Sequence, residues 1–264
     1  MSSSKSTADA FVTARRSGQA LAGFPGAIPE DLASAYECQE AAIAQWPDEI
    51  VGWKVGGVAP GLWQRFGATR VVGPIFRQAL HRAETGGMFL FPVFADGFAA
   101  VEAEYAMVIE RDAPADQIDW TVEQARALVG AIHISVETAG SPLATINDLG
   151  PTVIASDFGN NAGLILGPTI PDWQRSGFEQ AICRTSVDRA EVGNGNALSL
   201  SGGPFESLRV LLENCARRGR PLKAGTLAAT GAITGVHGIA AGQTARVDFG
   251  AFGVIECRAE PFRA

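Results

Sequence analysis

Residues 98–110 place two acidic side chains, Glu102 and Glu104, inside a strand-like run of apolar residues. Side chains two positions apart in a β-strand leave on the same face, so Glu102 and Glu104 would point the same way among apolar neighbours. Burying two ionised carboxylates side by side is costly unless a cation neutralises them. Mg²⁺ and Mn²⁺ prefer carboxylate oxygens, so this pair is a candidate metal site. The alternative is an edge strand whose acids lie in water.

Two further segments carry charged residues inside strand-like patterns. Residues 131–138 alternate like a strand and contain Glu137, with His133 on the same face by the period of two. His133 fits a half-buried structural histidine as well as a partner in the chemistry. Residues 50–58 also read as a strand, with Lys54 in the middle. Lys54 is either an edge residue that reaches into water or a cation awaiting an acidic ligand.

Composition excludes several classes of function. The hydrophobic content of 47% with 19% charged residues is that of a soluble globular protein, and no apolar run approaches the roughly 18 to 20 residues that span a membrane. A net charge of −7 without a basic run argues against nucleic-acid binding. The N-terminus lacks a signal-peptide core, and the cysteines lack metal-site spacing, so we expect a cytoplasmic protein with reduced thiols. The four cysteines are Cys38, Cys183, Cys215 and Cys257.

The order of predicted elements indicates an α+β protein. We expect one catalytic domain over residues 1–264, with a helical N-terminal arm at 1–48 and a mixed-sheet core at 49–264. Helix signals are present from Pro29 to before Pro47, over 122–129, and most clearly over 201–219. The segment after 222 reads as short strands with glycine corners, typical of a β-roll or barrel.

A polar cluster interrupts two apolar runs between residues 151 and 167. Asp157, Asn160 and Asn161 lie beside glycine in this segment. They fit turn residues, which is the ordinary role of Asp and Asn there, or the lining of a polar pocket.

The ordered motifs of the chain resemble the 2-keto-4-pentenoate hydratase and 4-oxalocrotonate decarboxylase family, within the fumarylacetoacetate hydrolase superfamily. The shared order spans about four fifths of the chain. The matching pieces are Ala35–Gln39, Val51–Gly56, Gly73–Phe76, Val101–Glu104, Glu137, Asp157 ten residues before Gly167, Gly202–Pro204, Leu222–Gly225, Thr230–Gly231 and Phe249–Gly253.

The resemblance implies a fold, a metal and site residues. The fold would be a mixed β-roll or barrel of the fumarylacetoacetate hydrolase C-terminal type, with an N-terminal helical arm and flanking helices. Glu102, Glu104 and Glu137 would bind Mg²⁺ or Mn²⁺, and Lys54 would lie in the pocket. Asp157 would orient a group there or support a ligand.

The resemblance also implies a substrate class, a small 2-oxo acid. Hydration of a 2-hydroxy-2,4-dienoate in aromatic meta-cleavage catabolism is our first interpretation, ahead of decarboxylation of a 4-oxalocrotonate-type acid. Hydrolysis of acylpyruvates and a catalytically silent partner subunit remain alternatives. We expect a homo-oligomer, or a complex with a related decarboxylase or hydratase.

Two positions depart from the family pattern. Val71 stands just before Val72-Gly73, where the family's hydratases carry an acid used in proton transfer, and Ala100 stands where they carry a basic residue. The first departure bears on the hydratase reaction more than on the fold or the metal. His133 is the candidate replacement base.

Overall fold

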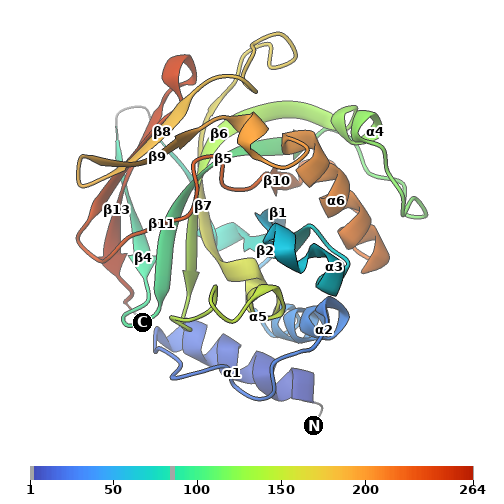
Figure 1. Cartoon of the computed structure of the whole chain (residues 1–264), viewed down its shortest axis with the longest axis vertical. Coiled ribbons are helices and arrows are strands. Elements are labelled where there is room, and N and C mark those ends of the chain that lie inside the picture. The colour runs from blue at the N-terminus through green and yellow to red at the C-terminus, as the bar shows by residue number, and fades with distance from the viewer. Residues whose placement is uncertain (1–2, 84–86, 264) are drawn as a thin grey trace.

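The computed structural model describes residues 3–83 and 87–263 and has the predicted α+β fold (Figure 1). Two β-sheets form the body of the molecule, and helices α1 and α2 lie together at one end (Figure 1). The single-domain boundaries stay a prediction.

The larger sheet has eight strands within the described residues. In order they are β2 (Arg70–Phe76), β1 (Ile50–Gly57), β10 (Leu227–Ala229), β5 (Phe98–Ile109), β6 (Val129–Ser141), β7 (Asn161–Thr169) and β3 (Leu80–Arg82), with β11 (His237–Gly238) beside β5. Both β5 and β1 therefore have a neighbour on each side. The edge-strand alternatives for Glu102, Glu104 and Lys54 are wrong, because none of these strands lies at an edge.

The larger sheet curls so that β2 comes into contact with β7 and a half-barrel forms. Apolar residues such as Ile75, Leu164 and Leu227 fill part of its concave face. Val101, Ala103 and Tyr105 point to the other face, where they pack in the main core. The alternation along β5 thus sends its two acids into the half-barrel.

The smaller sheet packs against the convex face of the larger one through this main core. Its strands are β4 (Met88–Val93), β13 (Val254–Pro261), β12 (Thr244–Asp248), β8 (Cys183–Val187) and β9 (Ala190–Gly195). The C-terminal segment is thus β-structure, as its pattern predicts.

Helices α1, α2 and α5 pack together as one group, and α3 and α4 are short. Helix α1 (Ser3–Ser17) packs on α2 (Leu32–Ile43), which packs on α5 (Pro151–Ser156). The short helix α3 (Trp63–Phe66) follows β1. Helix α4 (Val122–Arg126) is shorter than the predicted 122–129 because β6 already begins at Val129.

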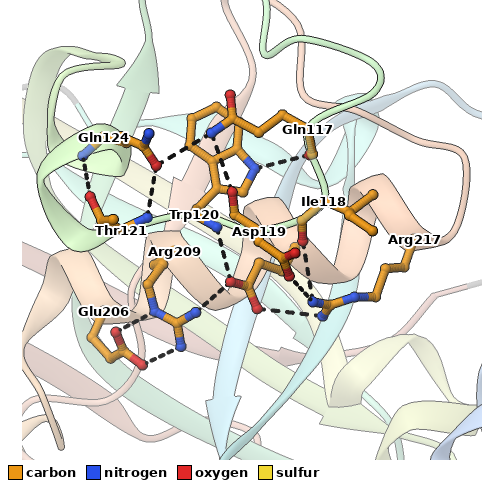
Figure 2. Close-up of polar contacts among 10 residues, drawn as sticks. Gln117, Ile118, Asp119, Trp120, Thr121, Gln124, Glu206, Arg209 and Arg217 are labelled. Atoms are coloured by element: carbon orange, nitrogen blue, oxygen red, sulfur yellow. Dashed lines mark hydrogen bonds and ion pairs between the residues drawn. The ribbon is translucent and has the colours of Figure 1, made fainter.

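Helix α6 (Pro204–Arg217) confirms the clearest helix of the sequence. Its apolar face is buried, and its polar face is tied to the loop before α4 (Figure 2). Arg209 binds Glu206 and Glu213, and Glu213 accepts a hydrogen bond from the backbone of Trp120. The N-terminal end of α6 lies near β2, where Arg70 donates to the carbonyl of Ser201.

No helix in the described part of the chain is long and apolar enough to cross a membrane. The four cysteines are buried free thiols, in agreement with the expected reduced state.

Candidate metal centre

Three glutamates meet on the concave face of the larger sheet. The antiparallel register of β5 and β6 sets Glu102 opposite Glu137, and Glu104 opposite Ser135. Residues directly opposite each other in such a pair share a face. One carboxylate oxygen of each glutamate lies within 4.8 Å of the others. All three side chains are buried, with Glu104 and Glu137 at 0% exposure and Glu102 at 5%.

Lys54 is the buried cation of this cluster. It lies on β1, is 3% exposed, and its Nζ is 3.3 Å from Oε1 of Glu137. Burial alone would lower the pKa of Lys54, but the attraction of Glu137, Glu102 and Glu104 outweighs it and raises the pKa above its ordinary value. Lys54 therefore stays charged, and one cation faces three acids.

The excess of acids raises the pKa of two of the three carboxyls. Burial raises the pKa of Glu102 to about 7, with repulsion from Glu137 adding to the shift and attraction to Lys54 opposing it. Burial, followed by repulsion from Glu137 and Glu102, raises the pKa of Glu104 well above its ordinary value. The single positive charge of Lys54 is not enough to offset burial and the mutual repulsion of these carboxyls.

Three carboxylate oxygens of the cluster also lack hydrogen bonds. Lys54 and the amide of Asn161 both contact Oε1 of Glu137, at 3.3 and 3.0 Å. Oε2 of Glu137 and both oxygens of Glu104 accept no hydrogen bond of good geometry within the described residues, although the backbone of Gly231 lies close enough to Glu104 to favour its charged form. Buried polar atoms are rarely left without a partner. An all-carboxylate donor set of this kind fits Mg²⁺ or Mn²⁺.

A pocket of about 550 Å³ leads to the cluster. Lys54 and Glu102 line it, while Glu104 and Glu137 lie deeper. Val71 lines it as well and is 1% exposed. The pocket wall is therefore apolar at the position where the family's hydratases carry an acid. Ala100 is fully buried in β5 between Ala139 and Gly238 and brings no basic group.

Asp157 lies outside this pocket, in a second buried cluster beside the end of α5. Nε of Arg15 and the hydroxyl of Ser141 each donate to its carboxylate. Arg15 also donates to the carbonyl of Asn161, whose side chain donates to Glu137. Asp157 thus reaches the metal cluster only through other residues. No local sequence pattern points to Arg15, because its partner is 142 positions away.

His133 is not brought to the carboxylates. It lies four residues from Glu137, about 13 Å along an extended strand. Its Nδ1 is 2.9 Å from the carbonyl of Gly167, and its ring also contacts Thr169. The structure therefore brings Lys54 together with the three glutamates, and leaves the role of His133 as base a prediction without geometric support.

No family model matches the chain. Two characterised relatives match it along most of its length. The TodF product hydratase of Pseudomonas putida strain F1 is 27% identical over 257 residues, which are 95% of this chain and 93% of the relative. The 2-keto-4-pentenoate hydratase of Paraburkholderia phymatum is 26% identical over 227 residues, 83% of each chain.

Solved structures share the fold. The 4-oxalocrotonate decarboxylase of Pseudomonas putida G7, complexed with magnesium and adipate, superposes with a TM-score of 0.80 at 18% identity over 97% of both chains. The fumarylpyruvate hydrolase of Pseudomonas aeruginosa, with Mn²⁺ and pyruvate, gives a TM-score of 0.60 at 16% identity over 82% of this chain and 91% of its own. The chain is therefore similar along most of its length to two hydratases, and it shares the fold of a 4-oxalocrotonate decarboxylase and a fumarylpyruvate hydrolase.

Proposed function

We propose that the protein is a divalent-metal-dependent lyase that acts on a small 2-oxo acid, and that its reaction is the hydration of a 2-hydroxy-2,4-dienoate in aromatic meta-cleavage catabolism. The observation that carries this proposal is the buried cluster of Glu102, Glu104 and Glu137 with three unpaired oxygens at the end of a pocket. The two characterised relatives, both named as hydratases, support the same reaction class.

The three glutamates would hold Mg²⁺ or Mn²⁺, which would polarise the keto group of a 2-oxo acid. Lys54 has three N–H donors, of which one is directed at Glu137. The other two donate to none of the described residues, so they would bind the substrate carboxylate or a water molecule. Val71 and its apolar neighbours in the pocket, Leu62, Trp63 and Ile154, would pack against the carbon chain and exclude bulk water.

Decarboxylation of a 2-oxo acid is the second candidate, and the apolar side chain of Val71 favours it. Hydration needs a group that delivers a proton to the substrate and one that activates water. The described pocket wall carries neither histidine nor aspartate. Loss of CO₂ begins without removal of a proton by a base, so it places a smaller demand on such a wall.

The test is to incubate the purified protein and Mg²⁺ with 2-hydroxypenta-2,4-dienoate, 2-oxo-3-hexenedioate and acylpyruvates. We expect loss of the dienoate absorbance, and Lys54→Met should abolish it while Mg²⁺ still binds. If only 2-oxo-3-hexenedioate reacts and CO₂ is released, the protein is a decarboxylase. Cleavage of acylpyruvates would identify a hydrolase, and no turnover with metal bound would leave the silent partner subunit.

We further propose that the protein is cytoplasmic, and that it forms a homo-oligomer or a complex with a related decarboxylase or hydratase. Light scattering of the purified protein, alone and mixed with a related subunit, would measure both states.

A further inference from the structure

Arg70 is a buried cation that the proposed reaction does not use. It is the first residue of β2 and is 5% exposed. Nη2 donates to the carbonyl of Ser201 at 2.6 Å. Nε has no hydrogen-bond partner, and no carboxylate of the described residues lies within 4.0 Å of the guanidinium. Arginine keeps its charge in proteins and has five N–H donors, so most of its binding capacity is unused.

The two acids that attract Arg70, Glu206 and Glu104, are already engaged elsewhere. Burial lowers the pKa of Arg70, and attraction to Glu206 and then to Glu104 opposes the shift. Both oxygens of Glu206 accept hydrogen bonds of 2.7 Å from Arg209, as Figure 2 shows. Glu104 belongs to the proposed metal ligands. The protein therefore attracts Arg70 from a distance but does not neutralise it.

Arg70 lines the same pocket as Lys54 and Glu102. The pocket thus has positive charge at two places, and only Lys54 is balanced by acids of the protein. Apolar side chains, among them Val58 and Leu200, line it as well. A buried cation without a partner is costly, and an anionic group of a ligand would remove that cost.

We propose that Arg70 binds a second carboxylate at the far end of the substrate, so that the protein prefers 2-oxo dicarboxylates to 2-oxo monocarboxylates. This inference rests on the proposed function, which places the 2-oxo acid end of the substrate at the glutamate cluster. It defines the substrate class for hydration and decarboxylation alike.

The test compares two ligands of equal chain length, 2-oxoadipate and 2-oxohexanoate, which differ in the terminal carboxylate. Their affinities for the Mg²⁺-loaded protein are measured by calorimetry, which needs no turnover. We expect 2-oxoadipate to bind about 10-fold or more tightly, as a charge-assisted, bidentate contact would give. Arg70→Met should remove this preference and leave 2-oxohexanoate within about 2-fold, whereas Arg70→Lys should keep part of it.

Arg65→Met is the matched control, because Arg65 is an exposed arginine in the same segment of the chain. It should leave both affinities unchanged. Equal affinities in the unaltered protein would overturn the role of Arg70 and leave the proposed function standing. An equal loss for both ligands in Arg70→Met would also overturn it, since Arg70 would then act only by holding Ser201. If neither ligand binds in the presence of Mg²⁺, the proposed function fails, and this inference fails with it.

Discussion

The protein buries charged side chains in two adjoining clusters that differ in how they are satisfied. In the Arg15–Asp157 cluster, one cation meets one acid. Arg15 donates to Asp157 and to the carbonyls of Asn161 and Gly140, and Ser141 donates to the remaining carboxylate oxygen of Asp157. The guanidinium also lies over the ring of Phe158, 5.0 Å from its centroid. Charge and hydrogen bonds are both balanced there by the protein itself.

In the glutamate cluster, the acids outnumber the cations. Lys54 faces Glu102, Glu104 and Glu137, and three carboxylate oxygens have no partner among the described residues. Asn161 joins the two clusters, because its backbone accepts from Arg15 and its side chain donates to Glu137. This difference indicates a structural role for the Arg15–Asp157 cluster and a ligand-binding role for the glutamate cluster. Folding satisfies the charges and hydrogen bonds of the first cluster, whereas the second would be satisfied by a bound cation.

The largest effect should follow from breaking the balanced cluster. Arg15→Met leaves the carboxylate of Asp157 buried without its cation, so the free energy of unfolding should fall by about 3–5 kcal/mol. Chemical denaturation measures this change. Arg16→Met, at the exposed neighbouring position, should change stability by less than about 0.5 kcal/mol. If the two variants are equally stable, the first cluster does not hold the N-terminal helix in place.

The glutamate cluster should instead make the metal-free protein less stable as the pH rises. The pKa of Glu102 is raised to about 7 in the folded state, so the folded protein binds more protons than the unfolded chain between about pH 4.5 and 7. Stability should fall across this window, by up to about 3 kcal/mol for this group. Lys54 stays charged throughout and adds no change.

Thermal unfolding with and without Mg²⁺ from pH 5 to 8 measures this effect. The cation competes with protons for the carboxylates. The increase in melting temperature that Mg²⁺ produces should therefore become larger as the pH rises. A gain that is constant from pH 5 to 8 would mean that the acids are ionised and paired without metal.

Neutralising one acid of the glutamate cluster should stabilise the metal-free protein. Glu104→Gln removes one of the like charges and keeps the shape of the side chain. We expect the free energy of unfolding at pH 8 to rise by about 1–4 kcal/mol, as replacement of buried ionic groups often does. Stabilisation by Mg²⁺ should disappear in the same variant. A loss of stability without metal would show that Glu104 has a partner within the protein.

The smallest effect should arise at the residue that joins the clusters. Asn161→Ala removes the hydrogen bond to Glu137, so affinity for Mg²⁺ should fall about 10- to 100-fold, as for other residues that orient metal ligands. Asn194→Ala, at an exposed position of β9, is the control. Calorimetric titration compares the two. Equal affinities would mean that Glu137 needs no support from Asn161.

The local patterns predicted what depends on short stretches of sequence. The alternation of β5 placed Glu102 and Glu104 on one face, and helix α6 followed from its apolar spacing and Pro204. Glu137 was found in the same way, on a strand that runs from Val129 to Ser141 rather than only over 131–138. Its place opposite Glu102 is a matter of register, which only the fold provides.

The features that the patterns missed depend on contacts between distant segments. Lys54 is central rather than at an edge because residues 227–229 pair with its strand. Nothing near Arg15 or Arg70 in the sequence signals that these two arginines are buried. Helix α5 was missed because its six residues, Pro151–Ser156, are too few for a helical period to show beside the polar cluster.

The central claim, that three glutamates hold a divalent cation, is tested most directly by titrating Mg²⁺ or Mn²⁺ into the metal-free protein. We predict one binding site per chain, and a loss of affinity of at least about 100-fold in the Glu102→Gln/Glu104→Gln double variant. The control is Glu110→Gln, which changes an exposed acid just beyond the end of β5. This variant should bind the cation with the affinity of the unaltered protein. Unchanged binding in the double variant would contradict the assignment of the metal site.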